Sequence, residues 1–480
     1  MDSQRLATVT IPAPDLRPDA FLAQLPAARR GFWARGDRWV AHRGVAAEIV
    51  IDGAPSGDDR FADVARRARA LAEDPVLAPG TTRAPRVRFY GGFSFRDGHV
   101  ADGAWAGFSR ARFVVPELEL EGDASGDAWL RARARAEPGR ENDTLARLRH
   151  LAEAARAELT SSGEAPSREG QAVPGEVATG ERARWEEAVE GCLAAIREGR
   201  ISKAVLARTV SVTLDRRIDP VDVVLHLWLA NRGSHVFLFE PEPDAALVGA
   251  APETVATLRD GVFHATAVAG SIRRGGSPRE QAELAAKLLA SDKDRAEQRI
   301  ALDDMIARLS TVAQQIRSDP QPHVLTLARI QHLETEIRAS VPAGVGVLDL
   351  LRILHPTPAV CGLPRDAALD VLAAGEPFER GWYAGPVGWF DAEGNGVFAP
   401  ALRTGVSRGA RWSLFAGAGI VEGSVPAAEW EETGIKFEPM LEALVAGGAR
   451  LPDDLPQGAS GGDPADRSSS VGADAGPERL

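Results

Sequence analysis

The chain has 480 residues, and its 56 Lys and Arg against 68 Asp and Glu give a formal net charge of −12. No apolar run approaches the ~18 residues of a membrane span, the N-terminus has no signal-like apolar core, and an acidic chain without a Lys/Arg stripe argues against a nucleic-acid partner. Two cysteines and nine scattered histidines form neither a disulfide framework nor a zinc motif, so we expect a cytoplasmic enzyme or binding protein.

Composition divides the chain into four stretches. Residues 1–160 alternate apolar strand-like runs, such as 87–95 and 111–118, with Arg-rich helices, which suggests an N-terminal subdomain. Residues 161–183 are rich in Gly, Ser, Glu and Pro and predict a flexible loop or insertion. Residues 184–448 are regular again, and residues 449–480 predict a disordered tail.

Within residues 184–448, periodicity predicts a helix over 185–198 and a strand over 203–214. Further on, strands are expected at 236–240, 246–249, 254–258 and 262–267, then helices at 278–290 and 293–317, strands within 324–337, a short helix at 348–354, strands at 383–390, 396–404 and 412–416, and a final helix at 427–445. Runs of strands interleaved with helix pairs predict a large α/β domain with substantial antiparallel sheet.

Lysine is scarce, since only four of the 56 basic residues are Lys and 52 are Arg. Arg does not deprotonate in the working range of a base, whereas the pKa of a desolvated Lys amine can fall into it. Lys203 heads an apolar strand, where its amine is either such a base or a cation that snorkels to the surface. Lys287, within an amphipathic helix, is expected to be solvated.

Two helix starts carry paired acids. Asp294 and Glu297 are spaced i, i+3, as are Glu429 and Glu432, so each pair lies on one helix face. Four oxygen donors without a His or Cys cluster suit Mg²⁺. The alternative is a solvated helix face with favourable N-terminal acids, which is the commoner situation for such spacing.

The run 415–420 ends a strand with Gly417 and Gly419 and superficially resembles a dinucleotide-binding loop. Glu422 occupies the position of the third glycine, and no strand–helix unit with a later acid follows, so that interpretation fails. Small residues here instead let backbone N–H groups approach a carboxylate.

Taken together, these residues resemble the chorismate-utilising enzymes, the family of anthranilate, aminodeoxychorismate, isochorismate and salicylate synthases. The resemblance covers roughly residues 185–446, with its segments in the same order as in the family, and it implies that residues 184–448 are the catalytic region. Its segments are Lys203-Ala-Val-Leu-Ala-Arg208, Gly249-Ala-Ala-Pro-Glu253, Ala269-Gly-Ser271, Ser291-Asp-Lys-Asp-Arg-Ala-Glu297, His355-Pro-Thr-Pro-Ala-Val-Cys-Gly362, Tyr383-Ala-Gly-Pro-Val-Gly388, Ala401-Leu-Arg403, Ala416-Gly-Ala-Gly419, and Glu429-Trp-Glu-Glu-Thr433 with Lys436.

Two positions discriminate between the activities of this family. Members that use ammonia have Gln where this chain has Lys203, whereas members that add water have Lys, and a water nucleophile needs a base. Aminodeoxychorismate synthases commonly place a Lys nucleophile where this chain has Ala269. The segment beginning His355-Pro resembles the isochorismate synthase version, and no glutaminase subunit is expected.

The resemblance implies a single large chorismate-binding fold of the α/β (α+β) class, with an antiparallel-rich β-sandwich core and helices packed outside. It implies an isochorismate synthase of menaquinone, siderophore or salicylate pathways, which is a monomer or homodimer. Lys203 is then the general base and Glu253 the general acid, while Glu297 and Glu432 bind Mg²⁺ with help from Asp294 and Glu429. The residues expected to bind chorismate are Gly270, Ser271, His355, Tyr383, Arg403, Gly417, Gly419 and Lys436, although a structural role for His355 is equally compatible.

Two alternatives stay open at this point. A salicylate synthase performs the same first step and then eliminates pyruvate. A non-catalytic chorismate-binding subunit belongs to another class of protein, but it needs neither the base Lys203 nor the acid Glu253. Gln298, where many relatives have His, and Asp294, where some have Glu, depart from the family pattern and bear on the outer shell of the metal site.

Overall fold

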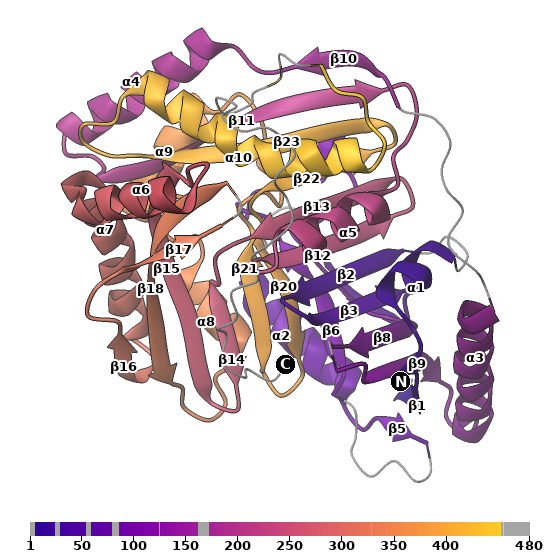
Figure 1. Cartoon of the computed structure of the whole chain (residues 1–480). Coiled ribbons are helices and arrows are strands. Elements are labelled where there is room, and N and C mark those ends of the chain that lie inside the picture. Colours follow the sequence, from indigo (N-terminus) through magenta and orange to yellow (C-terminus); the bar gives the residue numbers. More distant parts are fainter. Residues whose placement is uncertain are drawn as a thin grey trace.

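Two large β-sheets form the centre of the molecule, and helices cover their outer faces (Figure 1). The computed structural model describes residues 5–24, 29–53, 59–78, 86–123, 125–161, 172–327, 329–452 and 455. Within these ranges the paired strands are antiparallel except for one short parallel pair, β1 with β5. The predicted α/β fold with an antiparallel-rich sandwich core is therefore confirmed.

The first sheet has 13 strands and contains both the first and the last strand of the described chain. Its order is β10 (Pro174–Ala178), β11 (Lys203–Leu214), β23 (Arg411–Ile420), β22 (Thr404–Arg408), β13 (Ala245–Ala251), β12 (His235–Glu242), β2 (Arg30–Arg35), β3 (Arg38–Arg43), β8 (Leu118–Gly122), β9 (Ala128–Ala136), β1 (Arg5–Pro12) and β5 (Val76–Leu77), with β19 (Gly362–Leu363) paired to β11.

The second sheet has ten strands. Its order is β16 (Gln314–Ser318), β18 (Ile330–Ser340), β15 (Val262–Arg273), β14 (Ala256–Arg259), β21 (Gly396–Pro400), β20 (Pro386–Asp391), β6 (Arg88–Phe93), β7 (Ala111–Val115) and β4 (Ala47–Ile51), with β17 (His323–Thr326) paired to β18.

The core has three hydrophobic layers, one between the sheets and one on each outer face. The first sheet's outer face is covered by α1 (Pro18–Gln24), α3 (Glu141–Ser161), α5 (Pro220–Ala230) and α10 (Pro426–Ala446), and the second sheet's by α2 (Arg60–Ala72), α7 (Asp292–Leu309) and α8 (Val347–Leu354). The helices α4 (Arg182–Arg197) and α9 (Arg365–Gly375) pack against β11, α6 (Pro278–Ala290) lies beside β15, and η1 (Gly103–Trp105) is a single 3₁₀ turn. Among the described residues, none of these helices is long and apolar enough to cross a bilayer.

The N-terminal region completes both sheets. In the first sheet β2 pairs with β12, so that Trp33 lies opposite Phe237. In the second sheet β6 pairs with β20, so that Tyr90 lies opposite Trp389. Residues 1–160 therefore share their backbone hydrogen bonds and their core with the catalytic region.

The predicted loop and tail contain more structure than expected. Of the loop 161–183, residues 162–171 lie outside the described residues, but Pro174–Ala178 forms the edge strand β10 and α4 begins at Arg182. Of the tail, Ala449 pairs with Ala172 and Leu455 is buried in the core, while 456–480 lie outside the described residues. The prediction of a loop is wrong for Pro174–Ala178, because these residues form β10 and pair with β11.

Three predicted elements are shorter than their pattern indicated. The helix expected over 293–317 stops at Leu309, and β16 follows it. The strand expected over 396–404 is interrupted between Pro400 and Thr404, and the strand expected from Tyr383 begins only at Pro386. The two interrupted strands contain Arg403 and Ala384, whose φ angles of 51° and 61° are left-handed and cannot continue a strand.

Candidate functional site

A cavity lies where strands of the two sheets come together below α10. The first sheet contributes β11 and β23, and the second contributes β15 and β18. Helices α7 and α10 each add acidic residues at one side. The lining side chains and backbone include Val205, Pro252, Glu253, Ala269, Gly270, Ser271, Glu297, His332, Val360, Tyr383, Ala384, Arg403, Phe415, Gly417, Gly419, Glu432 and Lys436.

Lys203 is completely buried at the start of β11. Its Nζ lies 2.9 Å from Oε1 of Glu297 on α7, although the orientation does not satisfy a hydrogen bond. Because side chains alternate along a strand, Lys203 lies on the same face of β11 as Val205, which lines the cavity. A buried ammonium with unsatisfied donors is costly, so its position is typical of a functional group rather than of a snorkelling surface lysine.

Glu253 is the second buried ionisable group of the cavity. It follows the end of β13, is 2% exposed, and its Oε1 has no hydrogen-bond partner. Burial raises the pKa of this carboxyl to about 8, with a further contribution from the charge of Glu334, while Lys203 works in the opposite direction. Glu253 is therefore protonated at neutral pH and able to donate a proton.

Three of the chain's four lysines face acids of this site. Besides the Lys203–Glu297 pair, Lys293 Nζ lies 2.9 Å from Glu429 Oε1. Lys436 Nζ lies 2.5 Å from Glu432 Oε1 and also donates to the carbonyl of Gly417 at 2.9 Å. The fourth lysine, Lys287, is exposed on α6, as predicted.

The carboxylates of α7 and α10 supply oxygen donors that fit a hard cation such as Mg²⁺. Burial raises the pKa of Glu429, and the neighbouring negative charge of Glu432 adds to the effect. Burial also raises the pKa of Asp294, which Glu297 reinforces. Within the described ranges no three His, Cys, Asp or Glu side chains already converge on one metal position. The lysines neutralise the acids that face them in this arrangement.

Arg403 and Tyr383 form one wall of the cavity. Arg403 contributes a cation to this wall, and Tyr383 contributes a hydroxyl group. The Tyr383 ring stacks on Phe415 at a centroid distance of 5.1 Å. Arg403 is 8% exposed, and burial lowers the pKa of its guanidinium to about 10, so it stays charged at neutral pH. Its left-handed backbone interrupts the predicted strand, and this interruption brings the side chain into the cavity. Both residues suit a carboxylate ligand.

His332 on β18 also lines the cavity, and the sequence-based reasoning missed it. Arg403 Nη2 lies 3.1 Å from its Nε2, and Gly270 O lies 3.1 Å from its Nδ1. Because Arg only donates and a carbonyl only accepts, Nε2 accepts and Nδ1 carries the proton. Burial, followed by the charges of Arg403 and Lys436, keeps the pKa of His332 well below its ordinary value, so the ring is neutral. The ring joins the Gly270–Ser271 turn to Arg403.

Glycine at three positions makes room for functional side chains. A Cβ at Gly419 would lie 2.2 Å from Glu297 Oε1, and a Cβ at Gly417 would lie 2.9 Å from the Tyr383 hydroxyl. Gly270 has a left-handed φ of 72° at a bulge in β15, and its Cβ would lie 2.9 Å from that of Asp294. The predicted placement of Gly270, Ser271, Gly417 and Gly419 around the cavity therefore has a steric basis.

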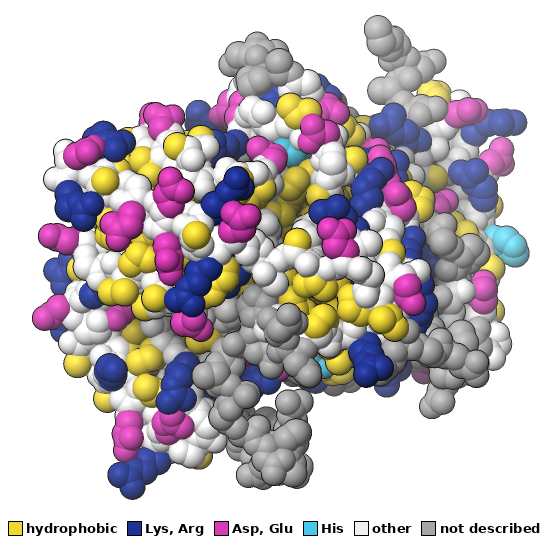
Figure 2. Space-filling view, turned by 90° about the horizontal axis from the view of Figure 1, so that it is seen from above, with side chains coloured by type: hydrophobic (Ala, Val, Ile, Leu, Met, Phe, Trp, Pro, Cys, Tyr) yellow, Lys and Arg dark blue, Asp and Glu magenta, His cyan; other side chains and the backbone are white. Residues whose placement is uncertain are grey.

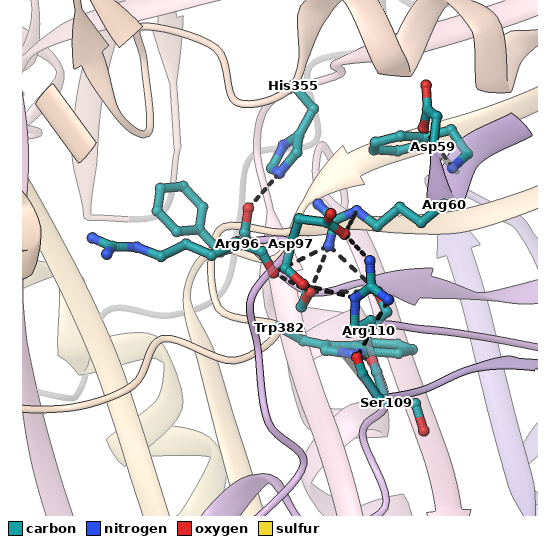
Figure 3. A network of polar contacts seen from close by, with 12 residues as sticks. Asp59, Arg60, Arg96, Asp97, Ser109, Arg110, His355 and Trp382 are labelled. Atoms are coloured by element: carbon teal, nitrogen blue, oxygen red, sulfur yellow. Dashed lines mark hydrogen bonds and ion pairs between the residues drawn. The ribbon is translucent and has the colours of Figure 1, made fainter. Parts of the chain in front are cut away.

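His355 lies outside the cavity lining, and its contact with substrate stays a prediction. Its ring points at the backbone carbonyl of Phe95, with Nε2 at 3.0 Å (Figure 3). Burial lowers the pKa of His355 to about 3, so the ring is neutral and Nε2–H donates to that carbonyl. The residue fastens the loop before Val360 to the N-terminal region.

The molecular surface mixes charges of both signs. Figure 2 shows one face of the molecule, on which Lys and Arg side chains alternate with Asp and Glu, and hydrophobic side chains lie in hollows between them. Around the cavity, in contrast, acids and lysines are gathered at one site, whereas on that face charges of both signs are spread out.

Comparison with known proteins assigns the chain to a family. The model of the chorismate binding enzymes matches residues 1–445. The salicylate biosynthesis isochorismate synthase of Pseudomonas aeruginosa is 36% identical over 390 residues, which are 81% of this chain and 80% of that relative. Isochorismate synthase MenF of Bacillus subtilis is 34% identical over 428 residues, 88% of each chain. The chain therefore belongs to the chorismate-binding enzymes.

A solved structure shows the same fold. MenF, the menaquinone-specific isochorismate synthase from Escherichia coli, matches with a TM-score of 0.75 and 25% identity, covering 92% of this chain and 95% of that one. The family resemblance that the motifs indicated is thus confirmed by the whole sequence and by the whole fold.

The protonation of Glu253 is directly measurable. We expect the infrared carbonyl band of its neutral carboxyl to disappear with a midpoint near pH 8, because burial raises the pKa of this group. Subtracting the spectra of Glu253→Gln isolates the band. Lys203→Met removes the charge that stabilises the carboxylate, so the midpoint moves to higher pH. A midpoint near pH 4.5 in the unmodified protein would contradict this description of the site.

Proposed function

We propose that the protein is an isochorismate synthase, an isomerase that converts chorismate into isochorismate with the aid of Mg²⁺. The observation that carries the proposal is the pair of buried groups Lys203 and Glu253. Glu253 lines the cavity and keeps its proton at neutral pH, and Lys203 lies beside the cavity, near enough for its charge to act on the Glu253 carboxyl. The names of the relatives from Pseudomonas aeruginosa and Bacillus subtilis support the same reaction.

Lys203 acts as the base. Once this amine has lost its own proton, its lone pair accepts a proton from a water molecule whose oxygen bonds to ring carbon 2 of chorismate. Nζ is buried beside Glu297 without a well-oriented hydrogen bond, so no other group occupies it in place of that water. Arg at this position would stay protonated and could not take the proton.

Glu253 acts as the acid. As the new bond to oxygen forms, the two ring double bonds shift by one position and the bond between ring carbon 4 and its hydroxyl breaks. The proton of Glu253 passes to this hydroxyl, which leaves as water, so one water is consumed and one is released. The reverse reaction exchanges the roles of the two groups, which is consistent with an isomerase.

The remaining residues hold the substrate. Arg403 and Tyr383 bind the enolpyruvyl carboxylate, and His332 keeps the guanidinium oriented. Glu297 and Glu432, with Asp294 and Glu429 beside them, would hold Mg²⁺, which supplies positive charge to the ring carboxylate when bound. For the metal to bind, these carboxylates turn from the lysines that neutralise them.

Water rather than ammonia is the proposed nucleophile, so the protein needs no glutaminase subunit. We further propose that it acts in the cytoplasm on free chorismate, without nucleic acid or membrane as a partner. A non-catalytic binding subunit does not account for the burial of an amine and a protonated carboxyl at the same cavity, since both are costly and neither is required for binding alone.

The reaction is tested by its products. Incubation of the purified protein with chorismate and Mg²⁺ is expected to give isochorismate, identified by chromatography and mass spectrometry. Chelation of the metal with EDTA should abolish turnover, and added Mg²⁺ should restore it. Formation of salicylate and pyruvate without any second enzyme would instead identify a salicylate synthase and contradict the proposal.

The role of Lys203 is tested by Lys203→Gln. Removing a general base is expected to lower kcat by roughly 10²- to 10⁴-fold, because this is the usual contribution of positioned proton transfer. Lys287→Gln is the matched control, since the same change on the exposed surface of α6 should leave kcat unaltered. Steady-state kinetics measure both. Unchanged turnover in Lys203→Gln would show that another group is the base.

A further inference from the structure

The strand that carries Lys203 lacks a neighbouring strand along part of one edge. On one side β11 pairs with β23 over ten residues. On the other side β19 pairs with Lys203 and Ala204, and β10 pairs from Ser211 onward. Between these two, in the described part of the chain, the backbone around Val205 and Ala207 faces no strand.

A buried ion pair fills this gap. Arg380 Nη2 donates to the carbonyl of Val205 at 2.6 Å, and the N–H of Ala207 donates to Glu376 Oε1 at 2.9 Å. Arg380 Nε in turn donates to Glu376 Oε2 at 2.8 Å. The two side chains thus supply the acceptor and donor that a paired strand would supply to these backbone groups.

Arg380 also reaches two other walls of the cavity. Its Nη1 donates to the carbonyl of Val360 at 2.9 Å, and its guanidinium lies 5.7 Å from the centroid of the Tyr383 ring. Its other ring contact is Phe95, at 4.4 Å, whose carbonyl holds His355. One guanidinium therefore contacts three segments that line the cavity, those at Val205, Val360 and Tyr383.

The segment behind Phe95 is itself fixed by charged side chains. Arg60 Nη1 donates to Ser94 Oγ at 2.6 Å, and Arg110 Nη2 donates to Asp97 Oδ1 at 2.5 Å (Figure 3). The N-terminal region thereby provides a rigid support for Phe95 and, through its ring, for Arg380.

We propose that Arg380, held by Glu376, is a positioning residue that keeps the Lys203 strand, the Val360 loop and Tyr383 in the arrangement that catalysis requires. This inference rests on the proposed function. A buried ion pair is a poor device for stability alone, because the loss of hydration of both charges offsets much of their attraction. The planar, five-donor guanidinium is instead suited to joining several acceptors in fixed directions.

The experiment replaces both charges, so that neither is left buried without a partner. The double variant Arg380→Gln/Glu376→Gln is compared with Arg133→Gln/Glu119→Gln, which removes a similarly buried pair on β9 and β8, away from the cavity. Glu119 also pairs with Arg131, which keeps Glu121 as its partner in this control. Thermal unfolding and steady-state kinetics with chorismate and Mg²⁺ are measured for both. We expect both melting temperatures to fall, but only the first variant to lose kcat, about 10- to 100-fold, with a smaller change in KM.

A conservative variant separates positioning from charge. Arg380→Lys keeps a cation beside Glu376 but cannot donate to Val205 and Val360 in the same plane. Compared with the double variant, it should therefore regain more of the melting temperature than of kcat. Full recovery of kcat in Arg380→Lys, or loss of kcat below two-fold in the double variant, would overturn the proposal. An equal loss in the Arg133/Glu119 control would overturn it as well.

A spectroscopic readout keeps this test independent of the reaction. If Arg380 fixes Lys203 relative to Glu253, the infrared titration midpoint of Glu253 should move in the Arg380/Glu376 double variant and stay unchanged in the control. An unmoved midpoint would count against the positioning role. If the unmodified protein did not convert chorismate at all, the proposed function would fail, and this midpoint would still decide whether Arg380 positions the site.

Discussion

The burial of Lys203 beside the cavity that Glu253 lines is the constraint on which the site depends. An ammonium group with no exposure needs negative charge nearby, and Glu297 on α7 supplies it at 2.9 Å. A second negative charge in the same apolar space would add another cost of lost hydration, and Glu253 avoids it by keeping its proton. The proposed base and the proposed acid are thus set apart by their surroundings, although both groups lie at one cavity.

The two sheets provide these surroundings through places where their strands stop being regular. Gly270 forms a bulge in β15, and Ala384 and Arg403 have left-handed backbones beside β20 and β22. Each irregularity points a functional group into the cavity or opens space for one. Non-glycine residues in this conformation cost about 1–3 kcal/mol each and persist only where the surrounding structure holds them. Here the hydrogen bonds between Ala384, Ala401 and Gly385 hold one of them.

Much of the site was predictable from the sequence because its residues occur in motifs. Lys203 stood out in a chain that otherwise uses Arg, and the paired acids of α7 and α10 followed from helical spacing. The interrupted strands were not predictable, since periodicity describes regular backbone and Arg403 acts through a break in it. His332 lacked any local signal, because its partners Arg403 and Gly270 come from distant parts of the chain.

Other features of the site have partners that are distant in sequence. The resemblance left both a substrate contact and a structural role open for His355, and the acceptor for its ring is the carbonyl of Phe95, 260 residues away in sequence. Glu376 and Arg380 are spaced i, i+4 just after α9, a pattern that carries no distinctive meaning until β11 is placed against it. The N-terminal region, in which the sequence indicated no chemistry, contributes strands to both sheets and the support beneath Arg380.

The central claim is that Lys203 and Glu253 together exchange a hydroxyl of chorismate for one derived from water. The most direct measurement is mass spectrometry of isochorismate formed in H₂¹⁸O. The account predicts that each product molecule gains one ¹⁸O in the new hydroxyl at ring carbon 2 and that the original hydroxyl oxygen is released to solvent. Product that carries no ¹⁸O would mean that the original hydroxyl migrates within the molecule, and it would contradict the account.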